Sequence, residues 1–269
     1  MTHTQFSRRT VLKAAVSPLF ISSSVLGRPV PSAIDRVNVG IIGLGGRCRT
    51  IAHDCLGIPE MRIVAVCDCF QPHIDAFQKS VGKDQNWKTY TDFRQMIENE
   101  NLDAVMVETT THARAWVVCH AMAAGMDAYI EKPMALTLPD ADAMIRACAA
   151  ANARLFIVKQ NRFNVPVVKL REALDAGRFG KMVLGTVRVR WCRPQAYYDQ
   201  DAWRGTWALD GGVLTNQASH HVDLLEWMMG GVESVFAMGT TRLATVETED
   251  TAVVTLKFAN GALGVIEAT

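Results

Sequence analysis

A lysine at a predicted strand end is the first side chain in this sequence that could do chemistry. Lys132 belongs to Glu131-Lys132-Pro133, which directly follows the apolar run 127–130. Ligands of open α/β sheets bind at the carboxyl ends of strands, and the proline keeps the lysine backbone out of the helical region. An ammonium group placed there could polarise a substrate hydroxyl. The alternative is an ordinary turn whose lysine side chain is solvated.

His220, which lies 88 residues after Lys132, is the candidate general base. If the segment 216–223 is helical, Asn216, His220 and Asp223 share one face at positions i, i+4 and i+7. His221 is then turned about 100° away. An imidazole titrates near neutral pH and can remove a hydroxyl proton while a hydride leaves the same carbon. The alternative is a histidine held by structural hydrogen bonds, although Gly211-Gly212 just upstream would let a ligand approach closely.

The segment Gly43-Leu44-Gly45 has the composition of a phosphate-binding turn. It follows the apolar run 37–42, and glycines there permit a tight turn before a helix whose N–H groups can face a pyrophosphate. Cys48 stands where the motif has its third glycine, which weakens it. Asp68 ends the next apolar run, where a carboxylate would accept hydrogen bonds from the adenosine ribose. This order predicts a dinucleotide site that prefers NAD to NADP, because a 2′-phosphate would meet a like charge.

Aromatic residues gather in a third place, together with an arginine. Tyr197, Tyr198, Trp203, Arg204 and Trp207 lie within about ten residues of one another. Aromatic faces pack against sugar C–H surfaces, and a guanidinium binds a carboxylate or phosphate. A carbohydrate subsite is one interpretation, and a subunit interface or the core of a loop is the other.

Two kinds of domain are expected to position these residues. The first part alternates strands with helices, which is typical of a doubly wound parallel sheet in an α/β fold. Its expected strands are 37–42, 61–66, 102–107, 128–130 and 155–158, and its expected helices are 49–56, 74–81, 113–124 and one that opens at 137. The later part predicts an α+β domain with an open, mostly antiparallel sheet. Its expected helices are 165–176 and 218–229, and its expected strands are 183–191, 232–239, 251–258 and 262–268.

We therefore expect a dinucleotide-binding domain over 34–158 and a substrate and oligomerisation domain over 159–269. The second sheet is expected to be truncated, because the sequence stops at Thr269 directly after a strand. The charges nearly cancel, with 28 Lys and Arg against 27 Asp and Glu, so nucleic acid and anionic membranes are not expected partners. The seven cysteines are scattered without metal-ligand spacing, so they are expected to be buried thiols rather than disulfides or a metal site.

Residues 1–33 do not continue the alternation of strands and helices that is expected in the rest of the chain. Ser7-Arg8-Arg9-Thr10-Val11-Leu12-Lys13 precedes a mildly apolar stretch, 14–26, which resembles a twin-arginine export signal. That stretch is too short to span a membrane as a stable helix. The sequence thus predicts export to the periplasm in a folded, cofactor-loaded state. A disordered arm on a cytoplasmic protein is the alternative.

Several segments together resemble the glucose-fructose oxidoreductase / inositol dehydrogenase / MocA family. They are Val39 to Arg47, the strand end at Asp68, Glu131 to Leu136, and Gly211 to Leu225. The resemblance implies a Rossmann domain followed by an open-sheet domain, NAD(P) chemistry on a sugar or polyol, and oligomers formed through that sheet. It implies that Lys132 hydrogen-bonds the reacting hydroxyl, that the Lys132–Pro133 bond is cis, and that His220 is the base. Many members have Asp where this chain has Asn216, so proton relay through this position is not expected, although an amide can still orient a substrate hydroxyl.

The segment from Asn216 to Asp223, with Lys159 to Asn164, is similar to the branch that oxidises C3 of UDP-N-acetyl amino sugars and their uronic acids. That branch is cytoplasmic, which disagrees with an export signal. The resemblance implies cofactor contacts at Gly43, Gly45, Gly46, Arg47, Asp68, Thr110, His112, Glu131 and Lys132. It implies substrate contacts at Arg162, Tyr198, Trp203, Arg204, His221 and Asp223.

The sequence therefore predicts an NAD-dependent dehydrogenase that oxidises a secondary hydroxyl of a sugar or nucleotide sugar. Lys132 would polarise the hydroxyl, His220 would take its proton, and Asn216 would set the geometry. This requires Lys132 and His220 to face one pocket beside the nicotinamide. Two alternatives stay open. One is an NAD-using glycosidase that oxidises C3 transiently, and the other is a non-catalytic NAD-binding regulator.

Overall fold

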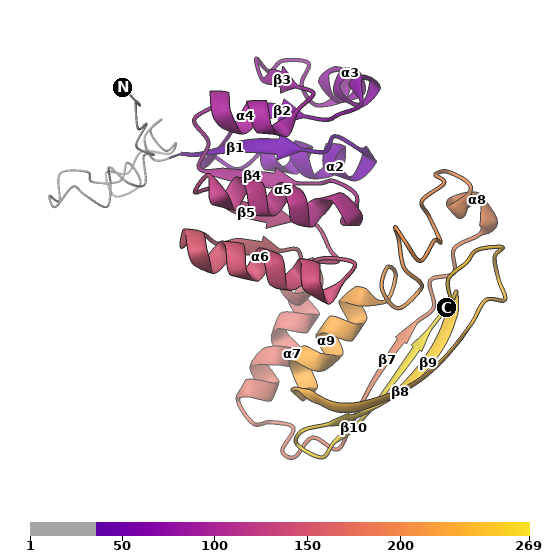
Figure 1. The fold of residues 1–269 in the computed structure, drawn as a ribbon. Helices are drawn as coiled ribbons and strands as arrows, with labels where there is room; N and C mark the ends of the chain where they lie inside the picture. Colours follow the sequence, from indigo (N-terminus) through magenta and orange to yellow (C-terminus); the bar gives the residue numbers. More distant parts are fainter. Residues whose placement is uncertain (1–35) are drawn as a thin grey trace, which may run out of the picture. The chain divides into compact units, whose positions relative to one another are not determined.

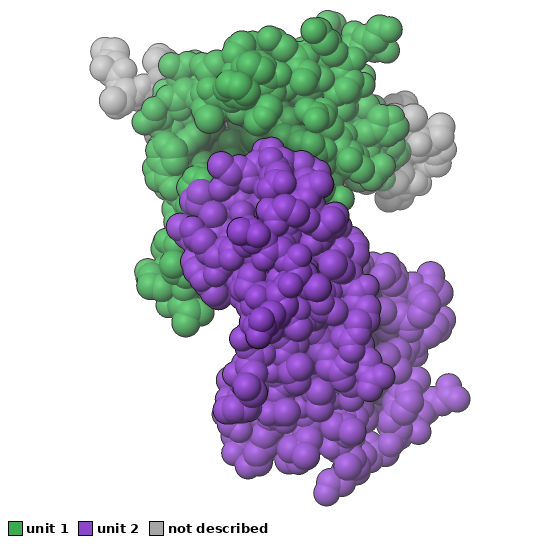
Figure 2. Space-filling model, turned by 90° about the vertical axis from the view of Figure 1, so that its right-hand side faces the viewer, with its two compact units in different colours: residues 1–157 green, residues 158–269 purple. Residues whose placement is uncertain are grey.

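The computed structural model describes residues 36–269, and the chain divides into two compact units. The first unit ends at Ile157, and the second is Val158–Thr269 (Figure 2). The segment that resembles an export signal lies outside the described residues. Among residues 36–269, no helix has the length and apolar character needed to cross a membrane.

The first unit is built on one parallel sheet with strand order β3-β2-β1-β4-β5-β6 (Figure 1). The order reverses direction between β1 and β4, which is the switch point where doubly wound sheets bind ligands. Its strands are β1 Val37–Ile42, β2 Met61–Cys67, β3 Lys88–Tyr90, β4 Ala104–Val107, β5 Asp127–Ile130 and β6 Leu155–Ile157. Its helices are α2 Gly46–Cys55, α3 Gln71–Ser80, α4 Phe93–Asn99, α5 Thr111–Ala123 and α6 Leu138–Ala151.

Helices cover both faces of this sheet, and each face has its own hydrophobic core. One core joins the sheet to α2 and α3, with Ile41 and Phe77 fully buried in it. The other joins the sheet to α4, α5 and α6, with Met96 and Val118 fully buried. Because the strands are buried on both faces, they read as continuous apolar runs rather than as alternating ones. The expected α/β architecture is confirmed.

The sequence analysis missed two elements of this unit and placed the starts of two helices three residues too late. β3 and α4 are short, with three and seven residues, although the buried Phe93, Met96 and Ile97 of α4 do have helical i, i+3, i+4 spacing. Asp92 caps α4 by accepting a hydrogen bond from the Arg94 N–H at 3.0 Å. Helix α2 begins at Gly46 rather than at residue 49, and α3 begins at Gln71 rather than at residue 74, with a proline in its first turn.

The second unit combines helices with a four-stranded sheet of order β7-β10-β9-β8 (Figure 1). Its strands are β7 Leu184–Val189, β8 Val232–Thr240, β9 Thr251–Phe258 and β10 Leu263–Ala268. Its helices are η1 Gln160–Phe163, α7 Val165–Asp175, α8 Gln195–Tyr198 and α9 Ser219–Met229. Strand β10 pairs antiparallel with β9 and parallel with β7, while β8 and β9 are antiparallel. The expected mostly antiparallel sheet is confirmed, with one parallel pair.

One face of this second sheet packs against α9. Leu225 and Met229 of α9 are buried together with Val254, Phe258 and Ile266 of the sheet. Exposed and buried side chains alternate along much of β9, and every residue of β8 is exposed. The other face of the sheet is therefore left open.

Candidate active site

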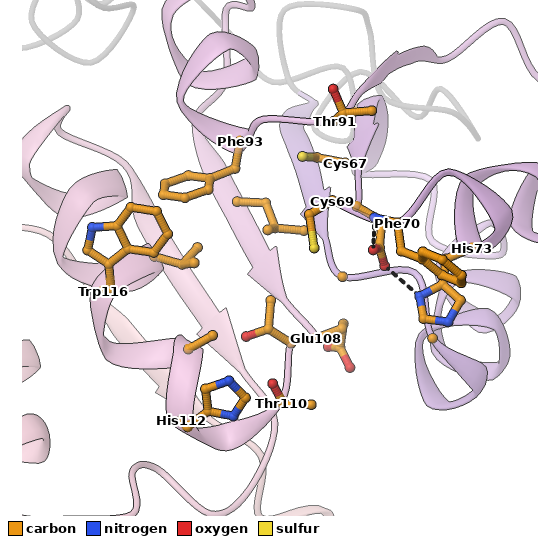
Figure 3. Close-up of a pocket in the computed structure, with 17 residues that line it drawn as sticks. Cys67, Cys69, Phe70, His73, Thr91, Phe93, Glu108, Thr110, His112 and Trp116 are labelled. Carbon is orange, nitrogen blue, oxygen red and sulfur yellow. Dashed lines mark hydrogen bonds and ion pairs between the residues drawn. The ribbon is translucent and has the colours of Figure 1, made fainter. Parts of the chain in front are cut away.

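A pocket of about 510 Å³ lies at the carboxyl ends of β1, β2 and β4 in the first unit (Figure 3). Its position is the switch point of the doubly wound sheet. The lining includes five of the residues expected to contact a cofactor: Gly43, Gly45, Asp68, Thr110 and His112. It does not include Gly46, Arg47, Glu131 or Lys132. Phe93 and Trp116 form an aromatic wall on one side of the pocket, and Phe70 and His73 lie on the other (Figure 3).

The glycine turn has the geometry that a phosphate requires. Gly43 has φ +93°, and a Cβ there would lie 2.8 Å from the backbone of Glu108 and of Thr109, so only glycine fits. Gly45 is the N-cap of α2, and no side chain among residues 36–269 caps this helix. A Cβ at Gly45 would have no described atom within 4 Å, which leaves the helix end open to the pocket. An anion can therefore reach the free N–H groups.

Asp68 is fixed by hydrogen bonds at the end of β2. Its carboxylate accepts from the Leu44 N–H at 2.8 Å and from the Phe70 N–H at 2.9 Å. The Nδ1 atom of His73 lies 3.1 Å from the same carboxylate. These contacts tie the carboxylate to the glycine turn and hold it at the pocket edge, where the sequence predicts a ribose contact.

The Glu-Lys-Pro segment follows β5, and its side chains interact with the helices that flank the pocket. Glu131 is buried, and its carboxylate accepts from Arg47 Nε at 3.1 Å and from the Lys132 N–H at 3.2 Å. The Lys132–Pro133 bond is cis, as the resemblance implied. The buried Arg114 of α5 donates to the Thr109 carbonyl at 3.0 Å and to the Pro133 carbonyl. Arg114 thus holds the β4 and β5 ends together.

Sequence reasoning gave no role to Glu108, which also lines the pocket. Glu108 follows β4 directly and is one of the lining residues labelled in Figure 3. Burial, with a further contribution from Glu131, raises the pKa of Glu108 to about 7. The sequence did offer one indication of a site role for Glu108, because it is the first residue after a buried strand. In the fold it lies beside the glycine turn.

His220 belongs to the second unit, where it is buried near the start of α9. Its Nε2 atom lies 3.2 Å from the amide nitrogen of Gln160 in η1. Sequence reasoning assigned no role to Gln160. A signal was present, because Gln160 lies inside the segment 159–164 that carried the family resemblance.

Asn216 does not lie on α9, so the condition under which it would share one helix face with His220 and Asp223 is not met. Helix α9 begins at Ser219, and the residues before it form a turn that is held by hydrogen bonds to residues outside the helix. Asn216 Nδ2 donates to Asp210, whose other oxygen accepts from the Gly205 N–H at 2.8 Å. A Cβ at Gly212 would overlap the Glu249 carboxylate, so that glycine accommodates a neighbouring side chain and not a ligand.

Asp223 lies one turn after His220 and binds two cations. Arg162 donates to both of its oxygens at 2.8 Å, and Lys159 Nζ lies 3.2 Å from one of them. Burial favours a higher pKa for Asp223, but these hydrogen bonds outweigh it, so the pKa lies below its usual value. The guanidinium of Arg162 also stacks on Trp227, 4.9 Å from the ring centre. Asp223 therefore positions Arg162 and Lys159.

His221, next to the candidate base, is partly buried. Burial lowers the pKa of its imidazole, so the neutral form predominates at pH 7. Its Nδ1 atom is buried, with no hydrogen-bond partner within the described part of the chain.

The aromatic loop of the second unit forms a separate pocket of about 380 Å³. Tyr198 and Arg204 line it, and Trp203 does not. The guanidinium of Arg204 lies 4.4 Å from the Tyr197 ring centre and 4.7 Å from that of Trp203, and its Nε is 3.0 Å from Asp201. Arg204 is thus held within the loop, and the same pocket is also lined by Asp199, Asp201 and Glu247.

The open helix end, the obligatory glycine and the fixed Asp68 fit a dinucleotide. The fold and this pocket together define a dinucleotide-binding protein of the doubly wound class. Two family models match the chain. The model of the oxidoreductase family, NAD-binding Rossmann fold, covers residues 37–159, and the GFO/IDH/MocA C-terminal domain covers residues 167–269. The chain belongs to the GFO/IDH/MocA family of oxidoreductases.

Similar proteins of known identity agree with this assignment. The myo-inositol 2-dehydrogenase of Thermotoga maritima is 32% identical over 237 residues, which cover 86% of this chain and 68% of that protein. The WlbA dehydrogenase of Bordetella pertussis, solved with NADH and UDP-GlcNAcA, is 37% identical, with a TM-score of 0.81 over 87% of this chain and 71% of that one. WlbA of Chromobacterium violaceum, solved with the same ligands, is 34% identical, with a TM-score of 0.82 over 90% of this chain and 69% of that one. The protein is therefore an NAD-dependent oxidoreductase.

Proposed function

We propose that this enzyme oxidises a secondary hydroxyl, at C3, of a sugar or nucleotide sugar. The observation that carries the proposal is the pocket at the switch point, where Gly43, Gly45 and Asp68 form a site suited to a dinucleotide. When bound, NAD supplies the hydride acceptor. Substrate choice is inferred from the WlbA proteins, which were solved with NADH and UDP-GlcNAcA.

The cofactor contacts divide by their chemistry. The turn at Gly43 and Gly45, with the start of α2 at Gly46, would hold the pyrophosphate, and Asp68 would accept hydrogen bonds from the adenosine ribose. The carboxylate of Asp68 disfavours the 2′-phosphate of NADP. Thr110 and His112, at the start of α5, would lie toward the nicotinamide half. Arg47 and Glu131, which form an ion pair, would support this end of the site through the backbone of Lys132.

Two side chains would perform the proton chemistry, and two amides would position the groups involved. Lys132 would donate a hydrogen bond to the reacting hydroxyl and lower its pKa, and His220 would take the proton. Gln160 has an amide nitrogen 3.2 Å from Nε2 of His220, and this nitrogen can only donate. Nε2 therefore accepts, so the neutral ring has its proton on Nδ1, and a substrate hydroxyl would have to displace this amide before Nε2 could take the proton. Asn216 would orient the sugar, with its amide held by Asp210.

The remaining residues would recognise the sugar. Arg162, held by Asp223, keeps 35% of its side chain exposed and would bind a carboxylate or phosphate of the substrate. His221 would offer a neutral imidazole to a hydroxyl. Tyr198, Trp203 and Arg204 would supply an aromatic surface at the loop, with Arg204 acting through its stacked rings rather than as a free cation.

A direct test is incubation with NAD and a panel of sugars and nucleotide sugars while NADH absorbance is followed. Lys132→Met and His220→Asn should abolish turnover and leave the Kd for NAD nearly unchanged. Lys169→Met and His53→Asn, at exposed positions on α7 and α2, serve as matched controls and should keep full activity. Substantial activity in either site variant would contradict the assigned roles. Release of free sugar without net NADH would favour a glycosidase instead.

The open sheet of the second unit is proposed to join copies of the chain. Phe236 and Met238 on β8 and Val253 on β9 are 68%, 69% and 50% exposed, an apolar surface of the kind found in interfaces. Light scattering should give a multiple of the monomer mass for the wild type and the monomer mass for Phe236→Glu. A monomeric wild type would contradict this assembly.

Export through the twin-arginine route is proposed from the sequence alone, with a cytoplasmic location as the alternative. Fractionation of cells that make the full chain should place it in the periplasm, and the change of Arg8 and Arg9 to lysine should retain it in the cytoplasm. Equal distribution of both forms would contradict export.

A further inference from the structure

Glu108 is a partly buried acid that lines the dinucleotide pocket. It follows β4, and its side chain lines the pocket between the glycine turn and the start of α5 (Figure 3). Both carboxylate oxygens are buried, with no hydrogen-bond partner within residues 36–269. An ionised carboxylate without partners is costly to bury, whereas a neutral acid costs much less. The site therefore favours the protonated acid.

Two arginines lie near Glu108, but other groups occupy them. Arg114 donates to the Thr109 and Pro133 carbonyls, and Arg47 pairs with Glu131. Burial and Glu131 act against ionisation of Glu108, and the two arginines offset this only in part, which places its pKa at about 7. The titratable and charged groups around Glu108 come from five elements and the segments next to them. They are Arg47, Cys48 and Cys55 of α2, Cys67 at the end of β2 with Asp68 and Cys69 after it, His73 of α3, His112 and Arg114 of α5, and Tyr129 of β5 with Glu131 after it.

We propose that Glu108 is a cofactor-binding residue that acts in its protonated form, donating its carboxyl O–H to an oxygen of the bound dinucleotide. This inference rests on the proposed placement of the dinucleotide against Gly43 and Gly45. A pyrophosphate there brings negative charge beside Glu108, and both phosphate and carboxylate oxygens only accept hydrogen bonds. One proton must lie between them. Binding to the ionised enzyme therefore takes up one proton from solvent, and no bond other than O–H is formed.

The test is calorimetric titration of NAD into the wild type and Glu108→Gln between pH 5.5 and 8.5. Two buffers with different ionisation enthalpies report the protons taken up. For the wild type we expect a Kd that is constant at low pH and rises toward tenfold per pH unit above about pH 7, with uptake approaching one proton. Glu108→Gln carries a permanent hydrogen-bond donor. Its Kd for NAD should therefore stay near the low-pH wild-type value at every pH, and the number of protons taken up on binding should fall by the contribution of Glu108.

Imidazoles in the same pocket require controls, because His73 and His112 also line it. In His73→Gln and His112→Gln, the proton uptake above pH 7.5 should persist. Circular dichroism checks that each variant is folded, and the uptake measured on the wild type needs no variant at all.

Three results would overturn the inference. Binding without proton uptake above pH 7 would exclude a protonated Glu108. A Glu108→Gln variant that binds at least tenfold more weakly at every pH would show that the ionised carboxylate accepts from a ribose hydroxyl instead. A wild type that binds no NAD at any pH would refute the cofactor placement itself, which separates that failure from a failure of Glu108 alone.

Discussion

Nε2 of His220 lies 3.2 Å from the amide nitrogen of Gln160, which is 60 residues earlier in the chain. Both residues belong to the second unit, where η1 lies against α9. The amide nitrogen donates, so it stabilises the neutral ring with its lone pair on Nε2. A base must be neutral before it can act, and a hydrogen bond donated to Nε2 would favour that form.

Replacement of Gln160 should therefore move the pH profile of the enzyme. In Gln160→Ala the neutral imidazole loses its donor, so the pKa of His220 rises and the acidic limb of kcat/KM shifts to higher pH. The maximal kcat should fall by roughly tenfold or more because the ring is less well oriented. The Kd for NAD should not change.

Asn161→Ala is the matched control, since it lies in the same short helix. It should leave the pH profile in place. A Gln160→Ala profile identical to the wild type would show that Gln160 has no influence on the base.

The sequence predicted the strand ends and the glycine turn, because buried parallel strands and tight turns impose local residue patterns. Gly43 and Asp68 were found in this way. The contact between Gln160 and His220 could not be predicted, since it depends on tertiary packing rather than on spacing. Helix α9 starts within one residue of its expected start, but Asn216 does not extend its face. Asn216 lies in a turn and donates to Asp210, and helical spacing does not reveal that competing partner. Glu108 was visible as a strand-end acid, but its lack of partners emerges only in the fold.

The two glycines of the turn should respond differently to alanine. Gly43→Ala places a Cβ 2.8 Å from the backbone of Glu108 and Thr109 at φ +93°, so the folded state is strained. We expect a loss of roughly 1–3 kcal/mol in unfolding free energy, measured by urea titration.

Gly45→Ala should instead weaken NAD binding without a change in stability. Gly45 has φ −64°, which alanine adopts readily, and no described atom lies within 4 Å of the added methyl. The methyl would occupy pocket space at the start of α2, so the Kd should rise at least about tenfold, or roughly 1.4 kcal/mol. An unchanged Kd would place the pyrophosphate elsewhere.

Cys69 offers a footprint of the cofactor that does not depend on activity. It is exposed and lines the pocket, whereas burial raises the pKa of the neighbouring Cys67 to about 12 and makes that thiol unreactive. N-ethylmaleimide should label Cys69, and NAD at ten times its Kd should slow this labelling about tenfold.

Cys192 is the internal control, because it is exposed in the second unit and does not line the pocket. Its labelling rate should be the same with and without NAD. Equal protection of both thiols would indicate a general change in the protein, and no protection of either would contradict the cofactor placement.

The ion pair of Asp223 with Arg162 and Lys159 should contribute stability with a defined pH dependence. The folded-state pKa of Asp223 lies below its ordinary value, so its contribution is complete above about pH 4, the unfolded value, and is lost as pH falls through the folded value. Asp223→Asn should therefore lower the unfolding free energy by about 1–3 kcal/mol at pH 7. The difference in unfolding free energy between Asp223→Asn and the wild type should stay constant from pH 7 to pH 5 and shrink below pH 4.

Glu172→Gln is the control, because it removes an exposed ion pair with Lys169 and should lower the unfolding free energy by less than about 1 kcal/mol. If Asp223→Asn cost no more than this control, the three-residue cluster would not stabilise the second unit, and its arrangement would serve the substrate alone.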